Sequence, residues 1–403
     1  MMTFKRNTAN PFTFLFLVLP YGISNGFVSV TLPFLLTKHG FSVAGAASIT
    51  ALGLSANIWR FLWSPMTDLS LSLHKWYLIG TGLCSSTLLL LCFIPLNISS
   101  MGVLTITVFL SQIAATLIVS PVGGFMAKTV PEEKKGRAGG WYQAGNLGGM
   151  GIGGGAGIWL SSHFSYQAAI IILSIAILIC SVALHFVPQV YAEKDRLLKE
   201  RFKMITVDVR NLFHSPITIF TMAVVIMPIG IGAASFLWSS VATDWKVNAD
   251  TVALITGTVS GVICVMGCVI GGWIADKLGR WWLYFGAGTL MALVTLVMSI
   301  SAYIPTTYII GVLLYAFTFG LSNAAFSAVV LHAIGKGLAS TKYALLSSLG
   351  NIPYAYMTFF DGWMHDAYSI KIMLLGETFF GICFVTIFLF LLYQLKLKKI
   401  VIN

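Results

Sequence analysis

The chain has 403 residues, of which 57% are hydrophobic and only 9% are charged, whereas soluble domains are about a quarter charged. So few charged residues cannot cover a water-facing surface, which excludes a soluble globular fold and makes lipid the expected solvent. The net charge of +11 does not indicate nucleic-acid binding, because the basic residues lie in alternate loops and not on one soluble face.

Long, continuous apolar runs follow one another along the chain. A transmembrane helix needs about 20 mostly apolar residues, whereas the strands of a membrane barrel alternate apolar and polar residues. The sequence therefore predicts an all-α membrane protein with twelve transmembrane helices. The predicted spans are 12–37, 43–68, 76–96, 101–127, 137–161, 166–187, 216–240, 250–276, 281–302, 306–334, 339–363 and 369–395.

The basic residues indicate the orientation. With the N-terminus inside, the outer loops contain only Lys38, Lys246 and Lys371, and nearly all other Lys and Arg residues lie inside. This distribution follows the positive-inside rule. It predicts a multi-pass protein, as in a bacterial inner (plasma) membrane, with both termini cytoplasmic. The first span is long and has no small-residue cleavage site, so we expect it to be retained and not removed as a signal peptide.

Residues 188–215 form the only long polar stretch, and apolar residues recur in it every three or four positions. This spacing predicts an amphipathic helix that lies on the cytoplasmic membrane surface. The stretch divides the chain into an N-terminal six-helix half (1–187), a cytoplasmic linker (188–215) and a C-terminal six-helix half (216–403).

The two halves resemble each other at a constant offset. Residues 20–22 (Pro-Tyr-Gly) match residues 228–230 (Pro-Ile-Gly), and Asp68 matches Asp276, in each case 208 positions later. Parallel six-helix repeats of this kind are typical of transporters that bind a solute between the halves. The sequence thus predicts two pseudo-symmetric six-helix halves.

The segment 272–280 reads Gly-Trp-Ile-Ala-Asp-Lys-Leu-Gly-Arg and follows the eighth span. It resembles the loop signature of the major facilitator superfamily: glycine, three residues, aspartate, a base, one residue, glycine and a base. Gly279 would allow a tight turn, and Asp276 would pair with Arg280 or cap a neighbouring helix N-terminus. The resemblance implies a latch between the halves, formed by Asp68, Asp276, Lys277, Gly279 and Arg280.

Residues 61–76 are a degenerate first-half copy of this motif and lack its glycines. Their sequence resembles one branch of the superfamily, the AmpG-like muropeptide permeases with the related acetyl-CoA transporters and siderophore importers. Residues 131–137 and 340–349 resemble the same branch, which implies a bulky or anionic organic solute. Residues 120–125, in the fourth span, contain no carboxylate where this branch usually has acidic residues.

Glycines recur at every fourth position of the fifth span. Small residues with this spacing allow helix backbones to approach closely. We expect a packing seam at the interface of the halves, where the fifth and eighth spans would meet and slide. The residues of this glycine stripe are Gly145, Gly149, Gly153 and Gly157.

Polar residues on helices expected to line a central cavity are the candidate solute contacts, with interhelical hydrogen bonding as the alternative. Arg60 either binds an anionic solute or extends to the cytoplasmic headgroups. Glu377 is expected near the outer headgroups, and His332 at an interface. The candidate substrate-binding residues are Asn25, Arg60, Gln112, Tyr142, Gln143, Asn146, Trp238 and Asn323.

The expected function is secondary active transport of an organic solute by alternating access. The expected partners are the solute, membrane lipid and a coupling ion (proton or sodium), and the expected state is a monomer. We expect no catalytic residue, metal or cofactor, because no Gly-x-x-x-x-Gly-Lys loop and no cluster of reactive side chains lies in the spans. The alternative is a non-transporting membrane receptor or sensor, or a membrane-embedded enzyme.

Overall fold

The computed structural model describes residues 8–41, 43–190, 207, 210, 214–334 and 339–394. The described residues form twelve helical segments and no strand, which confirms the prediction of an all-α membrane protein. Most of the predicted linker, residues 191–206 in particular, lies outside the described ranges, so its amphipathic helix stays a prediction.

We number the twelve segments as spans 1 to 12. Several consist of two helices in succession. In chain order they contain α1 (Thr13–Gly26) and α2 (Leu32–Lys38); α3 (Val43–Trp59) and α4 (Pro65–Leu69); α5 (Leu73–Leu90); α6 (Met101–Thr129); α7 (Lys135–Gly151) and α8 (Gly157–His163); α9 (Tyr166–Cys180); α11 (Pro216–Val225) and α12 (Trp238–Val241); α13 (Ala249–Val252) and α14 (Ser260–Leu278); α15 (Arg280–Ile300); α16 (Pro305–Ala333); α17 (Ala339–Leu349) and α18 (Ile352–Ala367); and α19 (Ile370–Gln394).

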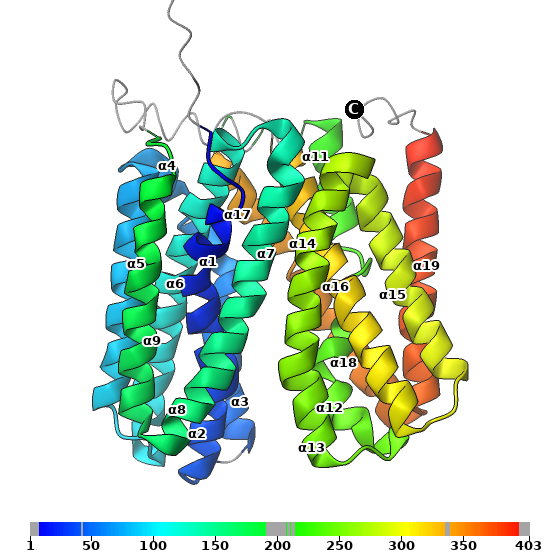
Figure 1. The fold of residues 1–403 in the computed structure, drawn as a ribbon, viewed down its shortest axis with the longest axis horizontal. Helices are drawn as coiled ribbons and strands as arrows, with labels where there is room; N and C mark the ends of the chain where they lie inside the picture. The colour runs from blue at the N-terminus through cyan, green and yellow to red at the C-terminus, as the bar shows by residue number, and fades with distance from the viewer. Residues whose placement is uncertain are drawn as a thin grey trace, which may run out of the picture.

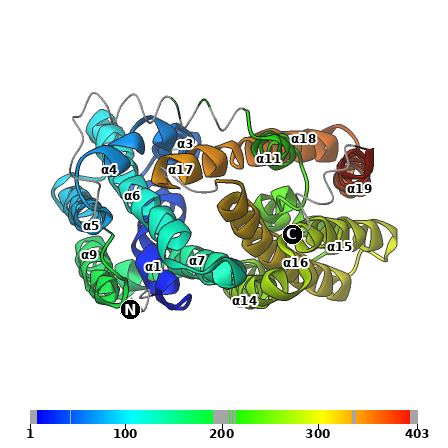
Figure 2. The ribbon, with the colours of Figure 1, turned by 90° about the horizontal axis from the view of Figure 1, so that it is seen from above.

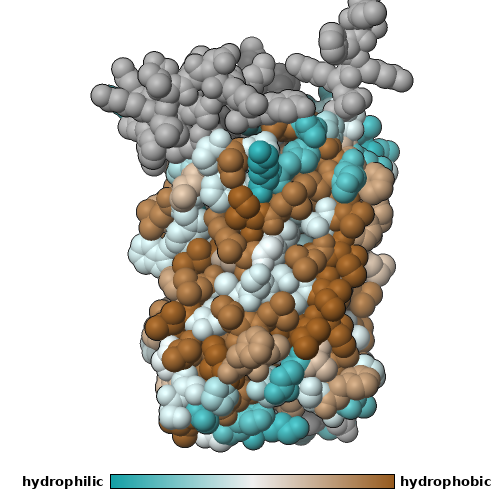
Figure 3. All heavy atoms as spheres, turned by 90° about the vertical axis from the view of Figure 1, so that its left-hand side faces the viewer, coloured by the Kyte–Doolittle hydropathy of each residue, from teal (hydrophilic) through white to brown (hydrophobic). Residues whose placement is uncertain are grey.

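Eight helices among the described residues are long and apolar enough to cross a membrane. Their outward faces carry large aliphatic side chains, such as Leu83 on α5 and Ile179 on α9, which are 46% and 63% exposed. The side of the N-terminal half shows an apolar band between two polar ends (Figure 3). A band of this extent fits the hydrocarbon core of a bilayer.

Span 7 is not the continuous helix that the sequence predicted for 216–240. Helix α11 ends at Val225, and residues 226–232 are not helical before a short 3₁₀ turn at Ala233–Phe236. Pro228 cannot donate a backbone hydrogen bond. Gly230 and Gly232 have φ angles of 62° and 73°, which side-chain-bearing residues rarely adopt. The break therefore follows from a proline and two glycines within five positions.

The two six-helix bundles stand side by side, α1 to α9 in one and α11 to α19 in the other (Figure 1). They touch through α7 with α14 and α16, and through α6 with α17. The view from above shows these helices along the line between the bundles (Figure 2). The start of α1, the end of α19 and the α6–α7 connection lie at the same end of the molecule, which we name the latch end.

Candidate functional site: the interface between the halves

Asp276, at the end of α14, caps the first turn of α7. Its Oδ1 accepts a hydrogen bond from the N–H of Gly136 at 2.6 Å, and its Oδ2 accepts one from the N–H of Arg137 at 3.0 Å. Oδ2 also pairs with Nε of Arg137 at 2.8 Å. A carboxylate at a helix N-terminus is favoured by the free N–H groups and the helix dipole. The capping alternative from the sequence therefore describes this contact, and the partner base is Arg137, not Arg280.

Glu132, just before α7, holds a second set of contacts across the interface. Its carboxylate pairs with Arg280 at 2.6 Å and with Lys135 at 2.8 Å, and Nδ1 of His332 lies 3.4 Å away. Hydrogen bonds with His332, Lys135 and Arg280 hold the pKa of Glu132 well below its usual range, although partial burial opposes this effect. His332 thus lies at an interface, as the sequence suggested. We name Glu132, Lys135, Arg137, Asp276, Arg280 and His332 the latch network.

The remaining motif residues have other surroundings. Gly279 has a φ of 98° and joins α14 to α15, so it makes the tight turn that the motif predicts. The ammonium group of Lys277 lies 4.1 Å from the ring centre of Trp273 on its own helix and forms no ion pair with another described residue. Asp68 is in α4, and its side chain lies outside the described atoms.

Two faces of α7 carry glycines with different partners. A Cβ on Gly140 would lie 2.5 Å from the carbonyl oxygen of Cys268 and 2.9 Å from Cα of Gly272, both on α14. A Cβ on Gly149 would instead lie 2.8 Å from the carbonyl oxygen of Leu19 on α1. The expectation that the glycine stripe lies at the interface of the halves is therefore wrong.

The other members of the stripe agree with this correction. A Cβ on Gly145 would meet Leu15 of α1, one on Gly153 would meet Ile23, and one on Gly157 would meet Thr31. All these contacts lie within the N-terminal half. The spacing of four positions placed the stripe on one helix face, but it carried no information on which neighbour that face meets.

The halves separate with distance from the latch end. A Cβ on Gly136 or Gly140 would lie within 3 Å of α14 atoms, whereas one on Gly148 would find Val265 only at 4.0 Å. Further along, Gly155, in the π-helical turn after α7, and Gly261 on α14 have no atom within 4 Å of an added Cβ. The contact between these two helices is thus concentrated at the latch end, so the described arrangement is closed there.

Arg60, in the 3₁₀ turn of span 2, lies between the halves. Its side chain is buried, and its Nε donates to Oγ of Ser348 on α17 at 3.1 Å. The described residues place no carboxylate within ion-pair distance of it. The residue is only 5% exposed, whereas an arginine that extends into the headgroups keeps its charged group in contact with water.

Three buried tyrosines lie close enough to this arginine to interact with its charge. Tyr142 on α7 and Tyr343 on α17 come from opposite halves, and their ring centres lie 6.0 Å apart. The charge of Arg60 acts electrostatically on both phenols and on Tyr21 of α1. Arg60 and the three tyrosines form what we name the arginine–tyrosine cluster. Tyr21, Tyr343 and Ser348 were not among the sequence candidates, because nothing in a single sequence indicates which spans meet.

Two further candidates follow Tyr142 on α7. Nε2 of Gln143 donates to Oγ of Ser327 on α16 at 3.0 Å, which is a contact between the halves. Nδ2 of Asn146 donates to Oε1 of Gln143 at 3.3 Å, and among the described residues Oδ1 of Asn146 has no hydrogen-bond partner. Asn146 is the more exposed of the pair.

The other candidates lie within one half. Gln112 is fully buried and donates to Ser24 of α1 at 3.1 Å, and Asn25 donates to Tyr21 at 3.4 Å. Trp238 is buried in an apolar cluster of the C-terminal half, 5.2 Å from the ring of Tyr315. Nδ2 of Asn323 donates to a carbonyl of its own helix at 2.9 Å. The structure places Arg60 and Tyr142 in the arginine–tyrosine cluster and connects Asn25 to it through Tyr21. Gln143 and Asn146 bond to each other and to Ser327, and Gln112 and Trp238 lie in the interiors of the halves.

The sequence placed Glu377 near the outer headgroups, and the structure places its side chain inside the C-terminal half. It is buried, and the hydroxyl of Tyr315 donates to its Oε1. Asp361 on α18 is also buried, with 0% exposure. The presence of a carboxylate inside each of two predicted spans was the signal for this site. The described residues contain no group of three or more His, Cys, Asp or Glu side chains that could hold a metal ion.

Two helical bundles that meet through a charged network at one end define a class of membrane transport proteins. The family model described as "Major Facilitator Superfamily" matches residues 14–355, so the chain belongs to this superfamily. A comparison with curated protein sequences finds no significant match.

Solved structures share the fold at low sequence identity. The proton:xylose symporter XylE, bound to 6-bromo-6-deoxy-D-glucose, has a TM-score of 0.71 at 13% identity over 95% of each chain. The E. coli fucose:proton symporter FucP has a TM-score of 0.71 at 14% identity over 94% of this chain and 97% of its own. The human organic anion transporter MFSD10 has a TM-score of 0.70 at 12% identity over 96% of this chain and 100% of its own.

Proposed function

We propose that the chain is a secondary active transporter that moves an organic anion by alternating access and binds it at the arginine–tyrosine cluster. The observation that carries this proposal is the buried guanidinium of Arg60, between the halves and without a carboxylate partner among the described residues. An arginine stays charged even in apolar surroundings. A solute carboxylate or phosphate would supply the missing negative charge through paired hydrogen bonds.

The position of the cluster suits a solute that is exposed to each side in turn. Residues from both halves surround Arg60, so a bound anion would contact both bundles and respond to their relative movement. The phenols of Tyr21, Tyr142 and Tyr343 would donate hydrogen bonds to the same anion or to the polar body attached to it. We propose Asn146, with its unpartnered Oδ1, as a further contact.

The latch network would stabilise the state that is closed at its own end. The positive-inside distribution supports a cytoplasmic location for this end and for both termini. We further propose residues 188–215 as a cytoplasmic linker between the halves, and a monomer in a bacterial inner membrane as the working form. In that orientation, the described state is closed toward the cytoplasm.

Muropeptides, siderophores and acyl-CoA are the anionic solutes to test first, because residues 61–76 resemble the branch that transports such molecules. A thermal-shift screen of the purified protein against these compounds should find a ligand that stabilises the wild type and not Arg60→Gln. Counterflow of the labelled ligand in liposomes then tests transport. Stabilisation without counterflow would identify a receptor or sensor and overturn the transporter.

A further inference from the structure

Two carboxyl groups lie buried in the C-terminal half, away from the interface. Asp361 is 0% exposed and Glu377 is 9% exposed. Glu377 is seven positions into α19 and Asp361 is six positions from the end of α18, so both lie about 10 Å from those helix ends at 1.5 Å per residue. The two groups interact electrostatically with each other.

The pair has few hydrogen-bond donors. Oε1 of Glu377 accepts from the hydroxyl of Tyr315 on α16, and the backbone N–H of Ala234 in span 7 also donates to this carboxylate. Both oxygens of Asp361 and Oε2 of Glu377 have no hydrogen-bond partner in the part of the chain that the structure describes. The ion pairs of the described residues bring no Lys, Arg or His to either carboxylate.

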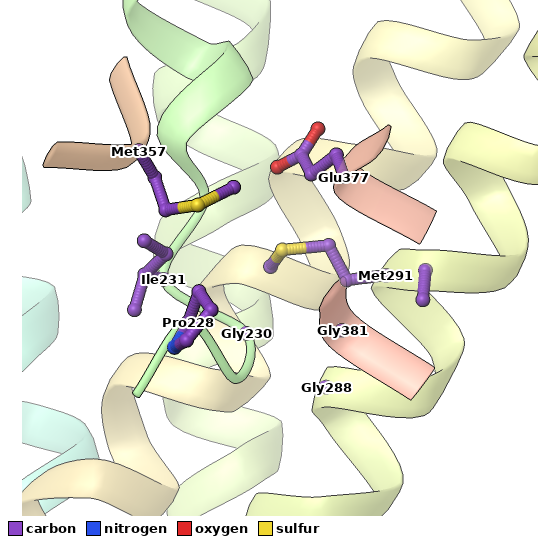
Figure 4. Close-up of a pocket in the computed structure, with 9 residues that line it drawn as sticks. Pro228, Gly230, Ile231, Gly288, Met291, Met357, Glu377 and Gly381 are labelled. Atoms are coloured by element: carbon purple, nitrogen blue, oxygen red, sulfur yellow. The ribbon is translucent and has the colours of Figure 1, made fainter. Parts of the chain in front are cut away.

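Glu377 borders a small cavity beside the break in span 7 (Figure 4). The cavity leaves about 10 Å³ for the centre of a water molecule, and its other lining residues carry no charge. They are Pro228, Gly230, Ile231, Gly288, Met291, Ala292, Met357 and Gly381. Membrane transporters often place coupling ions at such non-helical segments, because they line a cavity with free backbone groups.

Two negative charges cannot remain together in these surroundings. The penalty for burying one unpaired ion is several kcal/mol, and the repulsion between two like charges in apolar surroundings adds to it. The pair must therefore hold a cation. A proton needs no volume and no set of ligands. A metal cation needs several oxygen ligands, and the described side chains here supply only two carboxyls and one phenol.

The surrounding titratable groups leave the pair as the acidic centre of this region. Tyr315 is the facing group from α16, and the described contacts add no charged side chain from α15 or from span 7. His365 lies one turn beyond Asp361 on α18, but its ring nitrogens contact Asp244 at 3.0 Å and Asp366 at 3.1 Å. These three residues are partly exposed at the end of the bundle opposite the latch.

We propose that Asp361 and Glu377 form a proton-binding pair beside the break in span 7 and that this pair is the coupling site of the transporter. The coupling role rests on the proposed function, whereas proton binding does not. The pair takes up one proton from water on the side to which the site is open and releases it on the other side. Tyr315 orients Glu377, and the shared proton makes the two carboxyls titrate as one unit.

Infrared spectroscopy of the full-length protein in liposomes, without solute, tests proton binding. The wild type should show the carbonyl stretching band of a protonated carboxylic acid near neutral pH, and the band should decrease reversibly as the pH is raised. The double variant Asp361→Asn/Glu377→Gln should lack the band. Equal bands in the wild type and the double variant would overturn the site. Loss of the wild-type band on replacing potassium by sodium at constant pH would overturn the proton as the ligand.

Asp366→Asn is the matched control, because it removes an exposed carboxyl from the same helix and should keep the band. The substituted side chains are neutral and of nearly equal size, so the double variant should fold, which size-exclusion chromatography checks. The reversible pH titration of the wild type tests the site even without a folded variant: a carboxylic-acid band near neutral pH that does not change as the pH rises would contradict the proposal.

The coupling role is tested by the access of a maleimide to Cys268, a buried cysteine of α14 whose backbone carbonyl lies beside Gly140 of α7, in a background with the other cysteines replaced. The ratio of labelling rates between wild type and double variant should change about tenfold across the pH range in which the band disappears. A constant ratio would overturn coupling while leaving proton binding intact. Failure of counterflow with an intact infrared band would instead refute the proposed transport function.

Discussion

The carboxylate of Asp276 accepts a hydrogen bond from the backbone N–H of Gly136, 140 positions earlier in the chain, at 2.6 Å. A Cβ on Gly136 would lie 2.6 Å from the same Oδ1 atom, which is too close for any side chain. The glycine and the aspartate therefore act as one contact. It joins the end of α14 to the start of α7, and so joins the two halves of the protein.

Asp276→Asn should weaken the closed state at the latch end. The amide keeps one acceptor oxygen, so one backbone N–H of α7 loses its partner, and Arg137 loses its counter-ion. Hydrogen bonds to charged groups contribute about 1.5–3 kcal/mol, so we expect Cys268 to react with maleimide about 10–100-fold faster, with near-normal membrane insertion. Asp366→Asn is the control at the opposite end. An unchanged labelling rate in Asp276→Asn would show that this contact does not stabilise the closed state.

Alanine at Gly140 and at Gly149 should have different effects. At Gly140 the new methyl group would separate α7 from α14 without disturbing either bundle, so transport should slow while the melting temperature changes little. At Gly149 it would force α7 away from α1 inside the N-terminal half. Overpacking typically destabilises by about 1–3 kcal/mol, so this variant should melt at a lower temperature. Equal melting temperatures for the two variants would contradict the assignment of the two faces.

The lowered pKa of Glu132 predicts that the stability of the protein depends on pH in the acid range. Its pKa is lower in the folded protein, so its contribution to stability is present above the ordinary glutamate pKa of about 4.3 and is lost as the pH falls through the lowered value. Glu132→Gln should therefore lower the melting temperature near neutral pH, and the difference from wild type should shrink only below about pH 4.

The expected size of this effect is small. The Glu132 side chain is 49% exposed, and exposed ion pairs contribute about 1 kcal/mol or less. Glu133→Gln is the matched control, because the neighbouring Glu133 is exposed and forms no ion pair within the described part of the chain. A difference from wild type that disappears already between pH 7 and about pH 5 would show that another group controls the latch network.

Binding of an anionic ligand should depend on the geometry of the Arg60 guanidinium as well as on its charge. Arg60→Lys keeps the charge but loses the two-pronged donor, so we expect the affinity for the anionic ligand of the thermal-shift screen to fall about tenfold. Arg60→Gln should reduce it about 100-fold, in line with about 1.5–3 kcal/mol for each hydrogen bond to a charged group. Isothermal titration checks both values. Wild-type affinity in Arg60→Lys would show that the guanidinium does not bind the ligand through paired hydrogen bonds.

The orientation can be tested without any solute. A cysteine introduced at Lys134, which is exposed at the latch end, and another at Lys194 in the linker should react with an impermeant maleimide only from inside, in a cysteine-free background. A cysteine at Lys371, at the other end, should react only from outside. Labelling of position 194 from outside would reverse the topology.

Several features follow from the sequence alone because they are local. The length and apolar character of each run determine where a helix can cross lipid. The described helices accordingly overlap the predicted spans, although several extend a few residues beyond them, as α5 does from Leu73 and α18 does to Ala367, and span 7 is broken after Val225. That break depends on Pro228 and two nearby glycines, and the turn between α14 and α15 depends on Gly279. Both signals are therefore also local. The Pro228-Ile229-Gly230 repeat was noted in the sequence, but its meaning as an interruption of the helix was missed.

Which helix faces meet was decided only in the tertiary structure. Nearly uniform apolar spans do not specify how each helix is rotated about its axis, so the glycine stripe was assigned to α14 when it packs on α1. For the same reason the sequence left Arg280 and a neighbouring helix N-terminus as alternative partners of Asp276, and only the structure shows that this helix is α7 and that the paired base is Arg137. Asp361 and Glu377 lie in separate spans, and only the packing of α18 against α19 brings their charges together in apolar surroundings.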